Sequence, residues 1–145
     1  MKLVIQRVKH AKVEVNGNEI SKIGKGLLIL IGISKEDDGS QIQWLSKKVV
    51  ELRIFEDQQE KMNLSLKDVN GEILLVSQFT LYGNCLKGRR PDFLNAAQPE
   101  TAEKMYLDFA KALENKGIFP KLGKFGEHMS ISLLNDGPVT MILER

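Results

Sequence analysis

Residues 77–80, SQFT, have side chains that could do chemistry where the sequence otherwise reads as a buried strand. They follow the apolar run ILLV at 73–76 and place three hydrogen-bonding side chains, Ser77, Gln78 and Thr80, in four positions. A buried polar group without a partner costs a few kcal/mol. A regular strand would point these side chains to both faces. The pattern therefore predicts that the strand ladder ends or bulges near Gln78.

A strand that ends among polar residues has two interpretations. Where a ladder breaks, backbone N–H groups lose their partners, and free N–H groups beside a hydroxyl can stabilise the oxyanion of a tetrahedral intermediate. Alternatively, the polar side chains only cap the loop that follows. The pattern at 77–80 is compatible with both.

A second unusual segment is NDGPVT at 135–140. Asn-Asp-Gly is typical of a turn, and Pro138 fixes the backbone directly after the flexible Gly137. Because only about 5–6% of X–Pro bonds in folded proteins are cis, Gly137-Pro138 taken alone predicts a trans bond in a hairpin turn.

The composition limits the class of protein. The chain has 145 residues, a formal charge of +2 and one cysteine, Cys85, which excludes an internal disulfide and indicates a reducing compartment. The charge balance argues against a DNA-binding protein. The longest apolar run, 27–31, is far short of the roughly 20 residues that cross a bilayer, and the N-terminal run is too short for a signal peptide. We expect a cytoplasmic protein with no membrane or DNA partner.

Hydrophobic periodicity predicts a single mixed α/β (α+β) domain over residues 1–145. Most strands lie near the chain ends, so we expect mostly antiparallel sheets packed with two main helices, not a doubly wound fold. The last two expected strands would form a hairpin through the turn at 135–137. The expected strands are 2–9, 11–17, 26–33, 71–82, 124–134 and 138–145, the expected helices lie within 37–53 and 99–117, and 83–98 forms a long loop.

Three further sets of residues are candidates for binding. Arg7 shares a strand face with Leu3 and Ile5, so its guanidinium either enters the interior and binds carbonyl or carboxylate groups there, or reaches solvent at a sheet edge. Phe125 and Met129 would share the face of a strand, where packing in the core is the ordinary role. Basic side chains cluster in the loop, as a solvated surface or as phosphate contacts: Lys87, Arg89 and Arg90.

The pair of motifs SQFTLYG and NDGPVT resembles the signature of the D-aminoacyl-tRNA deacylases, the D-tyrosyl-tRNA deacylase family. The opening MKLVIQRV and the loop KGRRPDF are similar to that family too, so the resemblance spans essentially the whole chain. One departure is KFGEHM at 124–129, where the family more often has a small residue and Asp between Gly and Met.

The resemblance implies an enzyme of chiral proofreading that hydrolyses D-aminoacyl-tRNA, and also glycyl-tRNA. We expect it to need no metal or other cofactor, because the sequence has no His-Cys cluster and no paired-histidine spacing. It implies a homodimer with the active site at the subunit interface, where a cis Gly-Pro segment from each subunit enters the other's pocket and excludes L-amino acids. The implied residues are Ser77, Gln78, Phe79 and Thr80 for catalysis; Gly137, Pro138, Arg7, Phe125 and Met129 for the substrate; and Lys87, Arg89 and Arg90 for tRNA.

The residues are compatible with more than one mechanism. Thr80 is a candidate nucleophile, but neither histidine, His10 or His128, lies in a recognisable triad motif. We favour backbone N–H groups of Phe79 and Thr80 as the oxyanion site, with the ribose 2′-hydroxyl of the substrate assisting an attacking water, as proposed for the family. A non-catalytic RNA-binding domain and an esterase of small molecules are the alternative functions.

Overall fold

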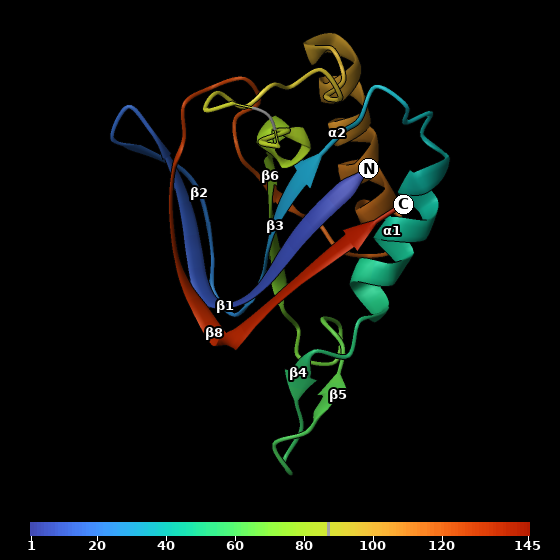
Figure 1. Cartoon of the computed structure of the whole chain (residues 1–145). Helices are drawn as coiled ribbons and strands as arrows, with labels where there is room; N and C mark the ends of the chain where they lie inside the picture. The colour runs from blue at the N-terminus through green and yellow to red at the C-terminus, as the bar shows by residue number, and fades with distance from the viewer. Residues whose placement is uncertain (87) are drawn as a thin grey trace.

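Two long antiparallel strands run through the whole molecule. The computed structural model describes residues 1–86 and 88–145, and in it β1 (Lys2–Val15) pairs with β8 (Ser130–Glu144) along nearly its whole length. Register shifts on either side of Val8 interrupt this pairing. Figure 1 shows both strands bending there, so that they form a V. Such irregularities bend a strand by leaving part of its ladder unpaired.

The two halves of β1 have different neighbours on the side away from β8. The first half pairs with β3 and the second half with β2, and the full order is β2-β1-β3-β6-β7 with β8 on β1. The β3–β6 and β6–β7 pairs are parallel. The sheet is therefore mixed, and the expectation of mostly antiparallel sheets is only partly right. The further strands are β2 (Asn18–Ile23), β3 (Gly26–Gly32), β6 (Glu72–Ser77) and β7 (Lys121–Leu122).

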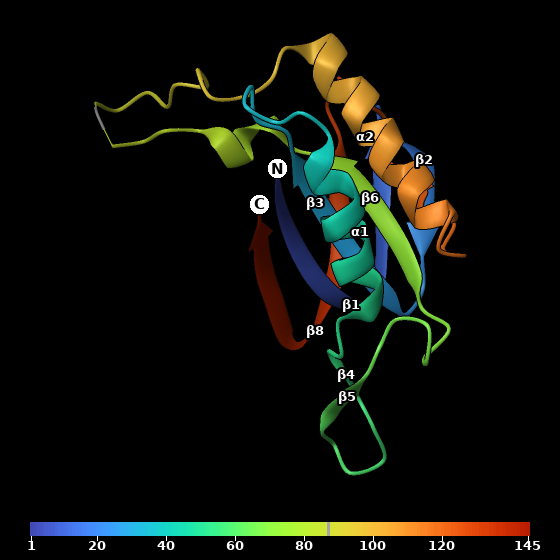
Figure 2. The same cartoon turned by 90° about the vertical axis from the view of Figure 1, so that its right-hand side faces the viewer.

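Both expected helices form, and both lie on the same face of the sheet (Figure 2). They are α1 (Ser40–Glu51), which lies on the connection between the parallel strands β3 and β6, and α2 (Pro99–Glu114). Pro99 occupies the first turn of α2, where its missing N–H has no cost. The apolar face of each helix packs on the sheet in a core that includes Leu3, Ile5, Ile29, Ile31, Leu45, Val49, Leu75 and Phe109.

A second apolar cluster fills the inside of the V. Alternate residues of β6 divide between the two cores, Leu75 toward the helices and Leu74 and Val76 toward the second cluster. A strand buried on both faces is apolar at every position, which explains the run before Ser77. The cluster consists of Val8, Ala11, Val13, Ile23, Leu28, Leu74 and Val76.

Four expectations about strands are wrong. The strands expected over 2–9 and 11–17 are one continuous strand, β1. The strand expected over 71–82 ends at Ser77, and a 3₁₀ helix, η1 (Phe79–Tyr82), follows it. Residues 124–129 are not a strand, and no hairpin forms at 135–137, because β1 offers β8 one continuous partner and the turn residues are absorbed at the bend. A short hairpin of β4 (Phe55–Glu56) and β5 (Met62–Leu64) was not anticipated.

Neither helix in the described part of the chain is long and apolar enough to span a membrane.

Candidate active site

At the end of β6, two successive backbone N–H groups have no hydrogen-bond acceptor in the described part of the chain. The Gln78 N–H is the last to bond to β3, donating to the Ile31 carbonyl at 2.8 Å, and the Leu81 N–H donates to the Gln78 carbonyl at 3.3 Å. Between them, the N–H groups of Phe79 and Thr80 have no backbone acceptor among the described residues. The prediction that the ladder ends near Gln78 is confirmed, and the first N–H groups of a helical turn are left free as expected.

A glycine on the neighbouring strand lets η1 fold against the sheet. A Cβ atom on Gly32 would lie 3.0 Å from the Leu81 Cβ and 3.1 Å from the Gln78 carbonyl oxygen. Both distances are shorter than ordinary van der Waals contact, so a larger residue would push η1 away from β3. Gly32 thus fixes where the free N–H groups lie.

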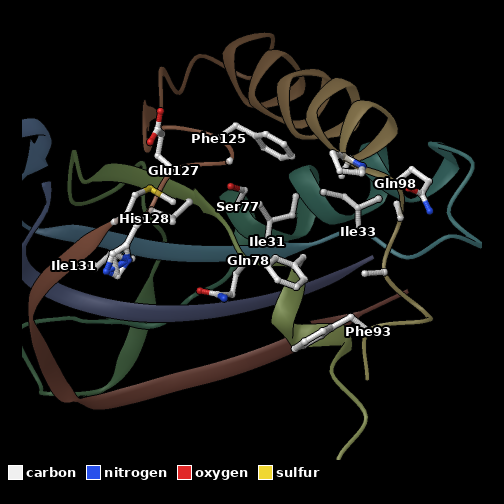
Figure 3. A pocket seen from close by; sticks show the side chains of 18 residues that line it. Ile31, Ile33, Ser77, Gln78, Phe93, Gln98, Phe125, Glu127, His128 and Ile131 are labelled. Carbon is white, nitrogen blue, oxygen red and sulfur yellow. The ribbon is translucent and has the colours of Figure 1, made fainter. Parts of the chain in front are cut away.

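A pocket of about 580 Å³ opens at this end of the sheet (Figure 3). Five of the predicted site residues line it, namely Ser77, Gln78 and Phe79 at the end of β6 and Phe125 and Met129 on the opposite wall. Most of the remaining lining was not predicted, and it comes chiefly from β3, the long loop, the start of α2 and the segment before β8. These residues are Ile31, Ile33, Val76, Phe93, Ala96, Ala97, Gln98, Pro99, Ala102, Gly126, Glu127, His128 and Ile131.

Two aromatic rings mark the mouth of the pocket. Phe79 is 57% exposed and meets Phe93 edge to face, with ring centroids 4.9 Å apart. Phe93 belongs to the KGRRPDF segment, of which only the basic residues were predicted to bind the substrate. Exposed aromatic rings on a mostly apolar pocket are suited to stacking on a ring or a flat base of a ligand.

A buried tyrosine holds the opposite wall against β6. The Tyr106 hydroxyl donates to the Leu75 carbonyl at 2.8 Å, and the Gly123 N–H donates to the same oxygen at 2.9 Å. The Tyr106 ring also packs on Phe125, with centroids 6.0 Å apart. Burial raises the pKa of Tyr106, so the hydroxyl remains a neutral donor. Phe125 therefore lies on an irregular segment fixed from α2, not on a strand as expected.

The Thr80 hydroxyl has a partner that cannot activate it. It accepts a hydrogen bond from the Gln78 side-chain amide, and Thr80 is exposed and outside the set of residues that line the pocket. An amide N–H₂ group donates and does not take up a proton. This arrangement offers no general base for Thr80 from its hydrogen-bond partner.

The second motif lies at the other end of the sheet. The Gly137-Pro138 bond is cis, as the family resemblance implies and unlike the trans bond expected from the dipeptide alone. Asn135 pairs with Val8, which pairs with Gly26 of β3, whereas Ser77 pairs with Ile31 of the same strand. Gly26 and Ile31 are five positions apart, or about 16 Å along a strand. Gly137 and Pro138 do not line the pocket of their own chain.

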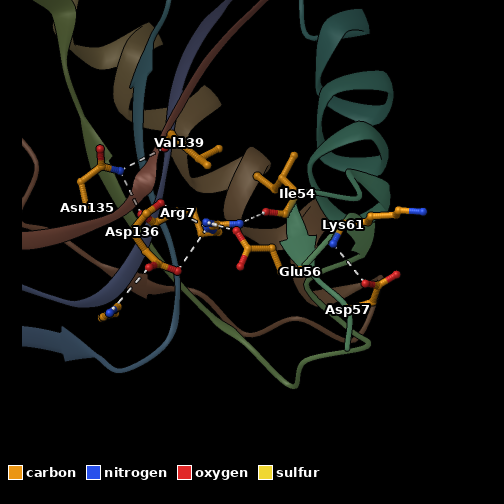
Figure 4. Close-up of polar contacts among 9 residues, drawn as sticks. Arg7, Ile54, Glu56, Asp57, Lys61, Asn135, Asp136 and Val139 are labelled. Carbon is orange, nitrogen blue, oxygen red and sulfur yellow. Dashed lines mark hydrogen bonds and ion pairs between the residues drawn. The ribbon is translucent and has the colours of Figure 1, made fainter. Parts of the chain in front are cut away.

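Arg7 lies between Asp136, at the start of this segment, and the residues Ile54 and Glu56 (Figure 4). It is 2% exposed, so the interior interpretation is confirmed and the solvent interpretation is wrong. Its Nε donates to the Asp136 carbonyl and pairs with the Asp136 carboxylate, both at 3.2 Å. Its Nη1 donates to the Ile54 carbonyl at 2.7 Å and its Nη2 to the Glu56 carboxylate at 3.1 Å. A buried guanidinium with this many acceptors has a fixed orientation.

Asn135 closes the same segment from the other side. Its side-chain amide donates to the carbonyl groups of Arg7 and Val139, each at 3.0 Å. These bonds join the residues before and after Gly137-Pro138 to β1. The sequence identified Asn135 and Asp136 only as turn formers, and Glu56 carried no signal.

The basic loop extends from the body of the molecule near the pocket (Figure 2). Arg89 and Arg90 are exposed, and a bridge between Asn84 and Asp92 joins the two sides of the loop. Lys87 lies outside the described residues. Across the described ranges, no group of three or more His, Cys, Asp or Glu residues is placed to hold a metal ion.

Comparison with known proteins agrees with the two motifs. A family model described as D-Tyr-tRNA(Tyr) deacylase matches residues 4–144. The D-aminoacyl-tRNA deacylase of Desulfatibacillum aliphaticivorans is 56% identical over 144 residues, covering 99% of each chain. That of Thermosipho africanus (strain TCF52B) is 54% identical over 144 residues, covering 99% of this chain and 97% of the relative.

A solved structure shares the whole fold. The c-Myc DNA Unwinding Element Binding Protein superposes with a TM-score of 0.93 at 45% identity, covering 100% of this chain and 99% of the other. The match of the family model and the full-length relatives both include the residues that form the pocket and those that hold Gly137. The chain therefore belongs to the D-Tyr-tRNA(Tyr) deacylase family.

Proposed function

We propose that this chain hydrolyses the ester bond of D-aminoacyl-tRNA in the pocket at the end of β6, releasing the D-amino acid and tRNA. The observation that carries the proposal is the pair of free N–H groups, on Phe79 and Thr80, next to this pocket in a chain of the deacylase family. The reaction removes a D-amino acid from tRNA before it can be used in translation.

The backbone donors supply the main stabilisation of the transition state. Attack on the ester carbonyl places negative charge on its oxygen, and two N–H groups of η1 are available to bind that oxyanion. Water is the nucleophile, and the ribose 2′-hydroxyl of the substrate assists it. Ser77 and Gln78 line the pocket and position the ester. This route requires no ionisable side chain to change its charge.

Phe125 and Met129 form the wall for the terminal adenosine. Both line the pocket opposite Phe79, and Phe125 is held by the buried Tyr106. A flat base between aromatic and thioether side chains gains stacking energy without a need for charge. Arg89 and Arg90 then bind phosphate groups of the tRNA, which adds affinity without contact to the ester.

The pocket is completed by a second subunit. In the described structure β8 pairs only with β1, so a strand of 15 residues has a free edge that exposes Leu134 and Ile142. A long unpaired strand edge is a liability that proteins cover. An isologous dimer through β8 covers it and brings Gly137-Pro138 of each subunit to the pocket of its partner. An exposed Pro138 there excludes an L-side chain, while glycine, which has none, is accepted.

The test is release of tyrosine from D-tyrosyl-tRNA and from L-tyrosyl-tRNA by the purified protein, with the molecular mass measured at micromolar concentration. We expect hydrolysis of the D-substrate only, and about twice the 16.3 kDa mass of the chain. Binding of tRNA without hydrolysis would favour the non-catalytic RNA-binding alternative. Hydrolysis of small esters but not of D-tyrosyl-tRNA would favour the small-molecule esterase.

A further inference from the structure

We propose that Glu56, on β4, is a positioning residue that sets the orientation of Gly137-Pro138 through Arg7. The inference rests on the proposed function, in which this segment excludes L-amino acids. Glu56 lies far along the chain from the NDGPVT motif, and the Arg7 guanidinium links the two by binding both Glu56 and Asp136.

Each nitrogen of the Arg7 guanidinium has its own acceptor, and the acceptors come from different parts of the fold. Nη1 binds the Ile54 carbonyl just after α1, and Nε binds Asp136 just before Gly137. Nη2 binds the Glu56 carboxylate. Because the fork is planar, three acceptors in different directions define both its place and its rotation.

The nitrogen that binds Glu56 is also the one that lies against Gly137. A Cβ atom added to Gly137 would lie 3.0 Å from the Nη2 of Arg7, so the guanidinium edge directly supports this residue. Without the Glu56 carboxylate, the Asp136 carboxylate is the remaining anionic partner of Arg7 in this contact. The fork would then turn toward Asp136 and withdraw its support from Gly137.

The hairpin that carries Glu56 is itself well anchored. Phe55 is buried beside it and pairs with Leu64 of β5. At the turn, the Asp57 carboxylate accepts hydrogen bonds from the N–H groups of Gln59 and Lys61 and from the Asn63 side chain. The Asn63 bond is the main reason that the pKa of Asp57 is lowered. Glu56 thus presents its carboxylate from a rigid element, which a positioning residue needs.

Burial separates this role from a purely stabilising one. The Glu56 side chain is 51% exposed, whereas that of Arg7 is 3% exposed. The Glu56 carboxylate is partly solvated, so its ion pair adds little to the free energy of unfolding. When Glu56 is removed, the guanidinium of Arg7 still has the Asp136 carboxylate and the Ile54 carbonyl as partners. Loss of Glu56 should therefore alter the selectivity of the enzyme more than its stability.

The experiment compares Glu56→Ala and Glu56→Gln with Glu60→Gln. Glu60 is an exposed acid at the turn of the same hairpin, and no contact with Arg7 is seen. The first readout is the ratio of kcat/KM for D-tyrosyl-tRNA over L-tyrosyl-tRNA. The second is the NMR signal of the Arg7 Nε–H, assigned by its loss in Arg7→Lys. The unfolding midpoint is measured for every variant.

For Glu56→Ala we expect the D-to-L ratio to fall by about tenfold, the effect of one hydrogen bond to a charged group. Glu56→Gln keeps a hydrogen-bond acceptor, so its D-to-L ratio should lie between those of Glu56→Ala and the wild type. The Arg7 signal should shift in both Glu56 variants. The unfolding midpoint should move little, and Glu60→Gln should match the wild type throughout.

An unchanged D-to-L ratio in a folded, dimeric Glu56→Ala protein would overturn the inference, and so would an equal loss in Glu60→Gln. If Glu56→Ala does not fold, Glu56→Gln decides in its place. A wild-type enzyme that shows no preference for D-tyrosyl-tRNA would refute the proposed function instead. The Arg7 signal would then still decide whether Glu56 fixes the guanidinium.

Discussion

The two ends of β3 lie in regions that differ in their hydrogen bonding. At one end, Ser77 and η1 present backbone donors without backbone partners next to an open, mostly apolar pocket. At the other end, near Gly26, the Gly137-Pro138 segment lies against Arg7 and Asn135, and each side-chain nitrogen of these two residues donates a hydrogen bond. Backbone donors are thus free at one end, among the described residues, whereas at the other end every side-chain nitrogen of Arg7 and Asn135 takes part in a hydrogen-bond network.

The contrast follows from what each end has to do. Stabilising an oxyanion requires donors that are still free when the substrate arrives, so a saturated site could not serve. Excluding an L-side chain requires a surface that does not yield, and a network of buried bonds supplies that rigidity. We infer that the chain separates reaction from selection in space, and that dimerisation joins them again.

The largest effect should come from breaking the hydrogen-bond network around Arg7. Arg7→Ala leaves the buried Ile54 carbonyl without its partner and removes the cation between Asp136 and Glu56. We expect the free energy of unfolding to fall by about 2–4 kcal/mol, measured by urea denaturation. Deacylation of D-tyrosyl-tRNA should fall with it, because Gly137 loses its support.

The matched control is Arg7→Lys, which keeps the charge but has one donor group in place of the planar fork. It should recover part of the stability and little of the D-to-L selectivity. If Arg7→Ala has the same midpoint of urea denaturation as the wild type, the network does not stabilise the fold and the contrast between the two ends is wrong.

The two ends also differ in how far the sequence predicted their structure. The free donors were predictable, because polar residues after the apolar run 73–76 mark a broken ladder locally. The partners of Arg7 were not predictable, because Glu56 and Asp136 reach it only through tertiary contacts. The continuous β8 was missed for a related reason. Residues 135–137 are typical of a turn, and the strand that keeps them extended, β1, lies at the other end of the chain.

A smaller effect is expected from changing Pro138, the residue proposed to exclude L-amino acids. Pro138→Ala removes the exposed ring that is proposed to meet an L-side chain in the partner subunit. Losing a few carbon atoms of a steric barrier alters discrimination by about ten- to a hundredfold. We expect hydrolysis of L-tyrosyl-tRNA to rise until the D-to-L ratio has fallen by that amount, in a protein that is still dimeric. Unaltered rejection of the L-substrate would assign the selection to the pocket.

A smaller and purely electrostatic effect is expected beside the pocket. Arg89 and Arg90 are exposed on the loop that extends from this end. Replacing both by Ala should raise KM by about tenfold with kcat nearly kept, and should lower the slope of log K against log salt by about 2. Exchanging the equally exposed Lys22 and Lys47 for Ala is the control for net charge. Equal effects in both double variants would remove the loop from the binding site.

The smallest effect is expected at the residue that looks most like a nucleophile. Loss of a true nucleophile lowers kcat by several powers of ten, whereas Thr80→Ala keeps the backbone N–H that we propose binds the oxyanion. The structure adds that the Thr80 hydroxyl accepts a hydrogen bond from the Gln78 amide, which cannot take its proton. We therefore expect kcat to fall less than about tenfold, the size of a lost contact that only orients Gln78. A Thr80→Ala protein that folds, dimerises and binds tRNA but does not deacylate it would show that the open end of the sheet works through a side chain after all.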